Sequence, residues 1–98
     1  MSDGAGDTPG TLKRTLPIGN KRGLHARAAA KIVRTAGQFD AAVRVSFKGQ
    51  EVSGLSIMGL MMLAAGIGSS IELTCSGRQA GEAMDALAAL VEGKFGEE

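Results

Sequence analysis

A two-residue alternation of apolar and polar side chains runs through several stretches of the chain, as is typical of β-strands with one buried face. It is clearest where Val43, Val45 and Phe47 alternate with Arg44 and Ser46. The Lys-Gly pair that follows indicates a tight turn into a short return strand, so the two strands form a hairpin. The pattern predicts four strands, over residues 12–18, 42–47, 50–53 and 70–76.

Helical spacing of apolar residues marks the segments between these strands. Residues 26–39 carry apolar side chains at intervals of three and four, and Gly37 marks the end of this helix. Residues 79–91 repeat the pattern. A third helix is predicted from Ile57 to about Ala64, with Ser56 as its N-cap. Because this helix is apolar nearly all round, it is either deeply buried or exposes one side to partners.

The predicted elements follow one another in the order β-α-β-β-α-β-α. Half-buried strands need one covered face, and three amphipathic helices can cover it. We therefore expect an α+β fold in which the helices lie on one face of a four-stranded, mostly antiparallel sheet. Residues 11–98 are predicted to form a single domain. Residues 1–10 are small and polar, with nothing to bury, and are expected to form a disordered tail.

The bulk composition narrows the classes of function. The chain of 98 residues is 44% apolar but only 3% aromatic, so its core must be aliphatic. Its net charge of +1 argues against a nucleic-acid partner, and no apolar run approaches the ~20 residues that a membrane span needs. A single cysteine, Cys75, excludes an internal disulfide and is compatible with a cytoplasmic protein. With one histidine and one cysteine, we expect no metal site and no cofactor.

Charge is distributed unevenly along the chain. Residues 8–39 contain seven basic side chains and no acidic one, whereas residues 40–98 contain eight acidic side chains and four basic ones. The first half of the chain therefore presents a positive surface around His25, which suits acidic partners or phosphorylated groups.

His25 is the only histidine and lies between a loop over residues 19–23 and the predicted start of a helix. Backbone N–H groups at a helix N-terminus bind anions, and the positive end of the helix favours neutral imidazole, which is the nucleophilic form. His25 could therefore accept a phosphoryl group, with Arg27 and the N–H groups stabilising the product. Gly23 is expected to leave the approach open. The alternative is that His25 is a loop residue without a chemical role.

Two short motifs resemble those of a known family. Gly-Leu-His-Ala-Arg at 23–27 and Ser-Ile-Met-Gly at 56–59 are similar to segments of the HPr phosphocarriers of the phosphoenolpyruvate-dependent phosphotransferase system. The likeness extends from about Leu12 to Phe95. It implies an open-faced β-sandwich, phosphorylation of His25 on Nδ1 by phospho-Enzyme I, and transfer to an EIIA-type acceptor, with Arg27 contacting the phosphate. Such a protein is a phosphoryl carrier and not an enzyme. The alternative is a regulatory protein-binding module on the same fold, against which the presence of His25 argues.

Other positions bear on the branch of the family. Ala28 stands where many relatives have proline, and it restores an N–H donor near the site. We expect this change to tune the site and not to abolish it. The run Leu-Met-Met-Leu at 60–63 and the ending Phe-Gly-Glu-Glu at 95–98 are similar to the nitrogen-related branch, NPr. We therefore favour that branch over a sugar-transport HPr.

The resemblance also implies regulation and docking. Ser56 is a helix N-cap, or it is in addition a regulatory phosphoserine made by an HPr kinase/phosphorylase. Enzyme I and the acceptor are expected to dock on the surface formed by the first two helices. The candidate docking residues are Leu24, Arg27, Ala28, Lys31, Ile57, Met58 and Met61. Core positions are the alternative for the apolar residues of this surface, and we expect at least half of Leu24, Ile57, Met58, Met61 and Met62 to be core.

Overall fold

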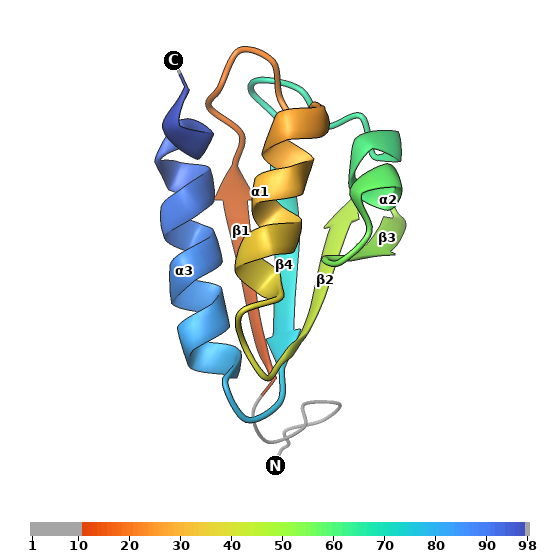
Figure 1. Cartoon of the computed structure of the whole chain (residues 1–98). Coiled ribbons are helices and arrows are strands. Elements are labelled where there is room, and N and C mark those ends of the chain that lie inside the picture. The colour runs from red at the N-terminus through yellow and green to blue at the C-terminus, as the bar shows by residue number, and fades with distance from the viewer. Residues whose placement is uncertain (1–10, 98) are drawn as a thin grey trace.

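The computed structural model describes residues 11–97, and Figure 1 shows its arrangement. Four strands form one sheet in the order β1-β4-β2-β3, and every neighbouring pair is antiparallel. The strands are β1 (Leu12–Pro17), β2 (Ala42–Phe47), β3 (Gln50–Ser53) and β4 (Ser70–Ser76). The helices are α1 (Ala26–Ala36), α2 (Ile57–Met62) and α3 (Ala80–Glu92), followed by a short turn, η1 (Lys94–Gly96). All three α-helices cover the same face of the sheet (Figure 1), which confirms the predicted α+β fold.

The core lies between the sheet and the helices and is almost entirely aliphatic. Alternate strand residues such as Leu16, Val45 and Leu73 are buried, and Ile32 of α1 and Leu87 of α3 pack over them. Burial of these side chains is the main favourable term in folding, because it removes apolar surface from water. The alternation in the sequence follows directly from this arrangement, since only one face of the sheet is covered.

Cys75 lies on the covered face of β4 and is fully buried. Burial raises the pKa of the Cys75 thiol, because the surroundings disfavour the thiolate. The residue therefore belongs to the core.

The element boundaries differ from the sequence prediction mainly at helix ends. Helix α1 stops at Ala36 with Gly37 as its C-cap, whereas the prediction ran to Phe39. Helix α2 stops at Met62, and Ala64 has a left-handed backbone (φ 57°) that a helix cannot continue through.

Two loops meet at the end of the sheet next to the start of α1. The backbone N–H of Leu24 donates to the carbonyl oxygen of Ala65 at 3.0 Å, which joins the loop before α1 to the loop after α2. Gly23 is buried at this junction with φ 64°, and a Cβ atom there would lie 2.4 Å from the Ala65 oxygen. The expectation that Gly23 leaves an open approach to the histidine is therefore wrong. Glycine is needed because the second loop packs against its backbone.

Two sequence expectations concern the chain's ends and its environment. The tail predicted over residues 1–10 lies outside the described residues. Among residues 11–97, no helix combines the length and the apolar character that crossing a membrane requires.

Candidate functional site

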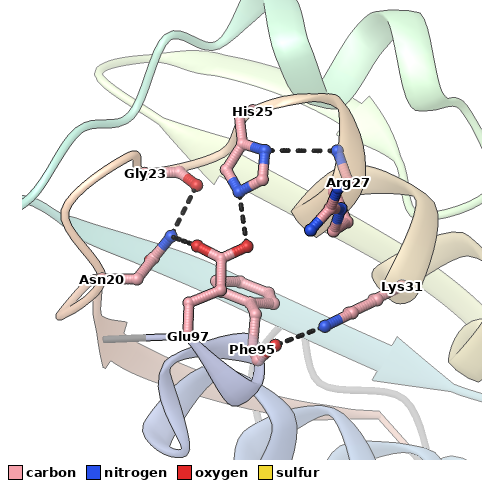
Figure 2. A network of polar contacts seen from close by, with 7 residues as sticks. All are labelled: Asn20, Gly23, His25, Arg27, Lys31, Phe95 and Glu97. Carbon is pink, nitrogen blue, oxygen red and sulfur yellow. Dashed lines mark hydrogen bonds and ion pairs between the residues drawn. The ribbon is translucent and has the colours of Figure 1, made fainter.

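His25 is the N-cap residue of α1, with an extended backbone (φ −77°, ψ 178°). Its Nδ1 atom accepts a hydrogen bond from the backbone N–H of Arg27 at 3.3 Å, so the imidazole takes the place that Ser, Thr, Asp or Asn usually occupies. Figure 2 shows the ring held beside the first turn of the helix. The sequence expectation of a histidine at a helix start therefore holds, and the structure adds that Nδ1 is the atom facing the helix.

The other ring nitrogen contacts the far end of the chain. Nε2 of His25 lies 2.6 Å from Oε2 of Glu97, which follows η1. Because Nδ1 accepts an N–H hydrogen bond, the ring proton of neutral His25 resides on Nε2, and Nε2 donates it to the carboxylate. This tautomer leaves a lone pair on Nδ1, the atom at the helix N-terminus. Both side chains are largely shielded, at 13% exposure for His25 and 19% for Glu97, so water screens their interaction only in part.

Asn20 fixes the second oxygen of the carboxylate. Its Nδ2 atom donates to Oε1 of Glu97 at 3.1 Å and to the carbonyl oxygen of Gly23 at 2.9 Å. Asn20 is the one fully buried polar residue in the described part of the chain. It therefore ties the loop before α1 to the carboxyl-terminal segment (Figure 2).

The segment after α3 turns sharply to place Glu97 beside the ring. Lys94 and Phe95 both have φ 57° and Gly96 has φ 75°, a run of left-handed residues that includes two with side chains. The Phe95 ring is 1% exposed and anchors this turn in the core. Nζ of Lys31 donates to the Phe95 carbonyl oxygen at 2.5 Å, from the second turn of α1. These contacts offset the cost of left-handed backbone at the two non-glycine positions.

The surroundings of Glu97 keep its carboxyl group ionised. Burial acts to raise its pKa, but the hydrogen bonds from Asn20 and His25, the charge of His25 when its imidazole is protonated, and the charge of Lys31 outweigh burial. The pKa of Glu97 is therefore below its ordinary value of 4.5. At neutral pH the histidine thus faces a carboxylate on one ring nitrogen and N–H groups on the other.

Sequence reasoning missed Glu97 and Asn20. In the sequence, the ending Phe-Gly-Glu-Glu indicates only a branch of the family, and Asn20 lies in the predicted loop over residues 19–23. The absence of acids from residues 8–39 was one available signal, because a carboxylate for His25 then has to come from elsewhere in the chain. No spacing in the sequence distinguishes Glu97 from the other acids.

Of the predicted docking residues, five lie at the surface or partly at it, and two do not. Arg27, Ile57 and Met58 are exposed, Met61 is 39% exposed, and Lys31 is half-buried under its bond to Phe95.

Leu24 and Ala28, by contrast, are 5% and 0% exposed. Ala28 lies on the face of α1 that packs on the core, one turn before Ile32, and Leu24 is held under Ala65 by its backbone hydrogen bond. In this conformation neither side chain offers a surface to a partner.

Helix α2 and its flanks form the main apolar surface of the protein. Six of the seven large apolar residues exposed in the described part of the chain fall between residues 55 and 67; they are Leu55, Ile57, Met58, Met61, Met62 and Ile67. Residues 52–71 also contain no charged side chain. The expectation that at least half of five apolar candidates would be core is wrong, because Leu24 alone is buried. We call the six residues the α2 patch, and exposed apolar patches of this kind mark interaction sites.

Ser56 is the N-cap of α2, as predicted. Its Oγ atom accepts a hydrogen bond from the backbone N–H of Gly59 at 2.9 Å. In a helix of only six residues this bond satisfies one of few free N–H groups.

Ser56→Ala should therefore lower the free energy of unfolding by about 1 kcal/mol, the usual effect of losing a capping oxygen. Urea denaturation monitored by circular dichroism measures the loss. Ser56→Asp retains a capping oxygen and serves as the matched control. Equal stability of the alanine and aspartate variants would contradict a capping role.

Comparison with known proteins agrees with this fold. Residues 12–93 match the family described as "PTS HPr component phosphorylation site". The chain is 54% identical over 86 residues to the phosphocarrier protein HPr of Cupriavidus necator, covering 88% of this chain and 97% of that protein. It is 44% identical over 86 residues to the phosphocarrier protein NPr of Shewanella violacea, covering 88% and 94%. The crystal structure of HPr from Thermoanaerobacter tengcongensis superposes with a TM-score of 0.84 at 42% identity, covering 89% of this chain and 98% of that one.

A single-sheet α+β fold with a histidine presented at a helix N-terminus thus coincides with a family of phosphoryl carriers. The chain belongs to the HPr family of phosphocarrier proteins of the phosphotransferase system. Its role is that of a phosphocarrier, and not that of an enzyme acting on a small substrate of its own. Relatives named HPr and NPr match over nearly the same span, so assignment to the nitrogen-related branch stays a prediction.

Proposed function

We propose that Nδ1 of His25 accepts a phosphoryl group from phospho-Enzyme I and passes it to an EIIA-type acceptor. The observation that carries this proposal is the pair of contacts on the imidazole. Nδ1 faces the N-terminus of α1 with an unprotonated lone pair that accepts only the 3.3 Å hydrogen bond from the Arg27 N–H, while Nε2 is held by the Glu97 carboxylate. The ring is therefore oriented and in the tautomer that a nucleophile requires.

The transfer needs no group beyond those of the donor and of this site. The Nδ1 lone pair forms a bond to phosphorus, and the bond from phosphorus to the donor breaks with its electrons returning to the donor. The imidazole then carries a positive charge, which Glu97 stabilises through the Nε2–H. The phosphoryl oxygens lie at the start of α1, where the N–H of Arg27 and the Arg27 guanidinium can neutralise them. In the second step a nucleophile of the acceptor forms a bond to phosphorus, the bond between phosphorus and Nδ1 breaks with its electrons returning to Nδ1, and the neutral ring is restored.

Partners are proposed to dock over α1 and α2. The α2 patch supplies apolar contact, and Arg27 with the other basic residues of 8–39 attracts acidic partners. The tie between Leu24 and Ala65 supports this assignment, because it holds the end of α2 next to the His25 loop. A partner that covers α2 is thereby brought up to the imidazole.

Ser56 is proposed as a site of regulatory phosphorylation by an HPr kinase/phosphorylase. A phosphate on Ser56 would place negative charge beside the α2 patch, within a stretch of 20 residues that has none. The charge would oppose docking of a partner that makes apolar contact there. The proposal is thus an off-switch that acts on the surface and not on the imidazole.

Incubation with phosphoenolpyruvate and Enzyme I tests the main proposal. We expect intact-mass spectrometry to show the addition of one phosphoryl group to the wild type, lost on mild acid treatment because the P–N bond is acid-labile. His25→Ala should gain none. If the wild type gains no phosphate, or the variant gains as much, the carrier function is refuted and a regulatory binding module becomes the better explanation. A parallel incubation with ATP and an HPr kinase, with Ser56→Ala as control, tests the serine.

A further inference from the structure

We infer that the methionines of α2 form a redox-sensitive element, in which their oxidation by peroxide prevents phospho-Enzyme I from docking while His25 stays chemically competent. This inference rests on the proposed function and adds a mode of regulation to it. It concerns three residues, Met58, Met61 and Met62, that the phosphoryl-transfer chemistry does not use.

The three methionines are accessible and gathered on one surface. Met58 and Met62 are 69% and 73% exposed, and Met61 is 39% exposed. Positions 58, 61 and 62 are three and four residues apart in a helix, so their side chains are neighbours on the same face. Met84 of α3 is 5% exposed and provides an internal comparison. Accessibility to a dissolved oxidant therefore separates the methionines of α2 from the buried one.

Oxidation of these methionines would change the surface on which a partner is proposed to dock. These side chains make up half of the α2 patch, which lies within a stretch, residues 52–71, that contains no charged side chain. Met62 also borders a hollow of about 330 Å³ between α2 and β3, whose other lining residues are Gln50, Glu51, Val52, Gly59 and Leu63. A partner that binds by apolar contact would meet the altered groups both on the helix surface and at this hollow.

The reaction is a two-electron oxidation with a balanced course. The thioether sulfur attacks one oxygen of hydrogen peroxide, the O–O bond breaks, and the second oxygen leaves as water. The product is methionine sulfoxide, whose polar oxygen must be desolvated or hydrogen-bonded when a partner covers it. Thiol-dependent methionine sulfoxide reductases reverse the change, so the element can cycle between two states.

The chain itself protects the imidazole from this effect. His25 contacts Glu97 and the helix backbone, Asn20 in turn holds Glu97, and none of these groups is a methionine. Oxidation of α2 therefore changes the docking surface and leaves the nucleophile in place. This separation makes the inference testable, because a small phosphoryl donor needs no docking surface.

The test treats the full chain with dilute hydrogen peroxide and maps sulfoxides by peptide mass spectrometry. We expect Met58 and Met62 to be oxidised before Met84. The oxidised protein should then accept phosphate from phospho-Enzyme I with a kcat/KM lower by about tenfold, the effect of one unsatisfied polar group in an apolar contact. Phosphorylation by phosphoramidate, a small donor, should be unchanged. Treatment with a methionine sulfoxide reductase should restore transfer from Enzyme I.

A triple variant, M58L/M61L/M62L, is compared with its own untreated sample and should transfer at the same rate before and after peroxide. The inference is overturned if mapped sulfoxides at 58 and 62 leave transfer unchanged, if the triple variant loses as much as the wild type, or if phosphoramidate labelling falls equally. Oxidation of Met84 as fast as that of Met58 would also overturn it. Lack of transfer to the untreated wild type would refute the proposed function itself, which separates the two failures.

Discussion

Replacing Gly23 by alanine should lower the free energy of unfolding by about 3 kcal/mol, the sum of a left-handed backbone cost and a steric overlap. The added Cβ would lie 2.4 Å from the carbonyl oxygen of Ala65 and 2.8 Å from Cα of Gly66. Both are backbone atoms, so no side-chain rotation relieves the overlap. The two loops would have to separate, which would break the bond from Leu24 to Ala65. Chemical denaturation of the purified variant measures the loss.

Gly49→Ala is the matched control for this prediction. Gly49 has φ 82° in the turn between β2 and β3, and a Cβ there would meet nothing within 4 Å. Its substitution should therefore cost only the backbone term, about 1 kcal/mol. If the two alanine variants were equally unstable, the close approach of the two loops would not explain the requirement for glycine at 23.

Glu97→Gln should slow phosphoryl transfer from phospho-Enzyme I by about tenfold. Removing the carboxylate that orients a metal-binding histidine has an effect of this order in metalloproteins. An amide has one acceptor oxygen, whereas Asn20 and the Nε2–H of His25 each donate to the carboxylate. One donor then faces the amide nitrogen, or the imidazole moves its proton to Nδ1 and loses the nucleophilic lone pair. Stopped-flow or quench kinetics with labelled phospho-Enzyme I would measure the rate.

Glu92→Gln is the control for the change of net charge. Glu92 forms a surface pair with Arg14 at 3.6 Å, and both side chains are about half exposed, so little effect is expected there. A tenfold loss in Glu92→Gln, or an unchanged rate in Glu97→Gln, would contradict the assignment of Glu97 as the residue that positions His25.

The pH dependence of stability gives an independent check on Glu97. Its pKa is lower in the folded protein than the ordinary value of 4.5, so the unfolded chain binds the proton more readily. The contribution of Glu97 to stability is therefore complete above about pH 4.5. It is lost as the pH falls through the lower pKa that Glu97 has in the folded protein. The stability difference between wild type and Glu97→Gln should shrink over this acidic range, which denaturation curves at successive pH values would show. A difference that stays constant down to the acid limit would contradict the ion pair.

The fold was predictable because it depends on patterns that a single buried face imposes. Val43 and Val45 alternate with polar residues since only one side of β2 is covered, and the spacing in α1 has the same cause. The placement of His25 and Arg27 at the start of α1 was predictable for a similar reason. Both lie within one turn, so the local sequence is enough to place them together.

The position of Glu97 beside His25 was not predictable from such local patterns. Its position depends on the burial of Phe95 and on left-handed backbone at Lys94 and Phe95, residue types that do not signal such a conformation. Which side of α2 faces solvent was not predictable either. A helix that is apolar all round lacks the periodic alternation of apolar and polar residues that identifies the buried face.

The face of the sheet that the helices do not cover is a suitable place for attaching probes. Thr15 of β1 is exposed and alternates with buried Leu16, so it points away from the helices and from His25. A Thr15→Cys variant would carry one accessible thiol, because the native Cys75 is fully buried. A fluorophore or a surface tether placed there would leave α1 and α2 free, and binding of partners could be followed without covering the histidine.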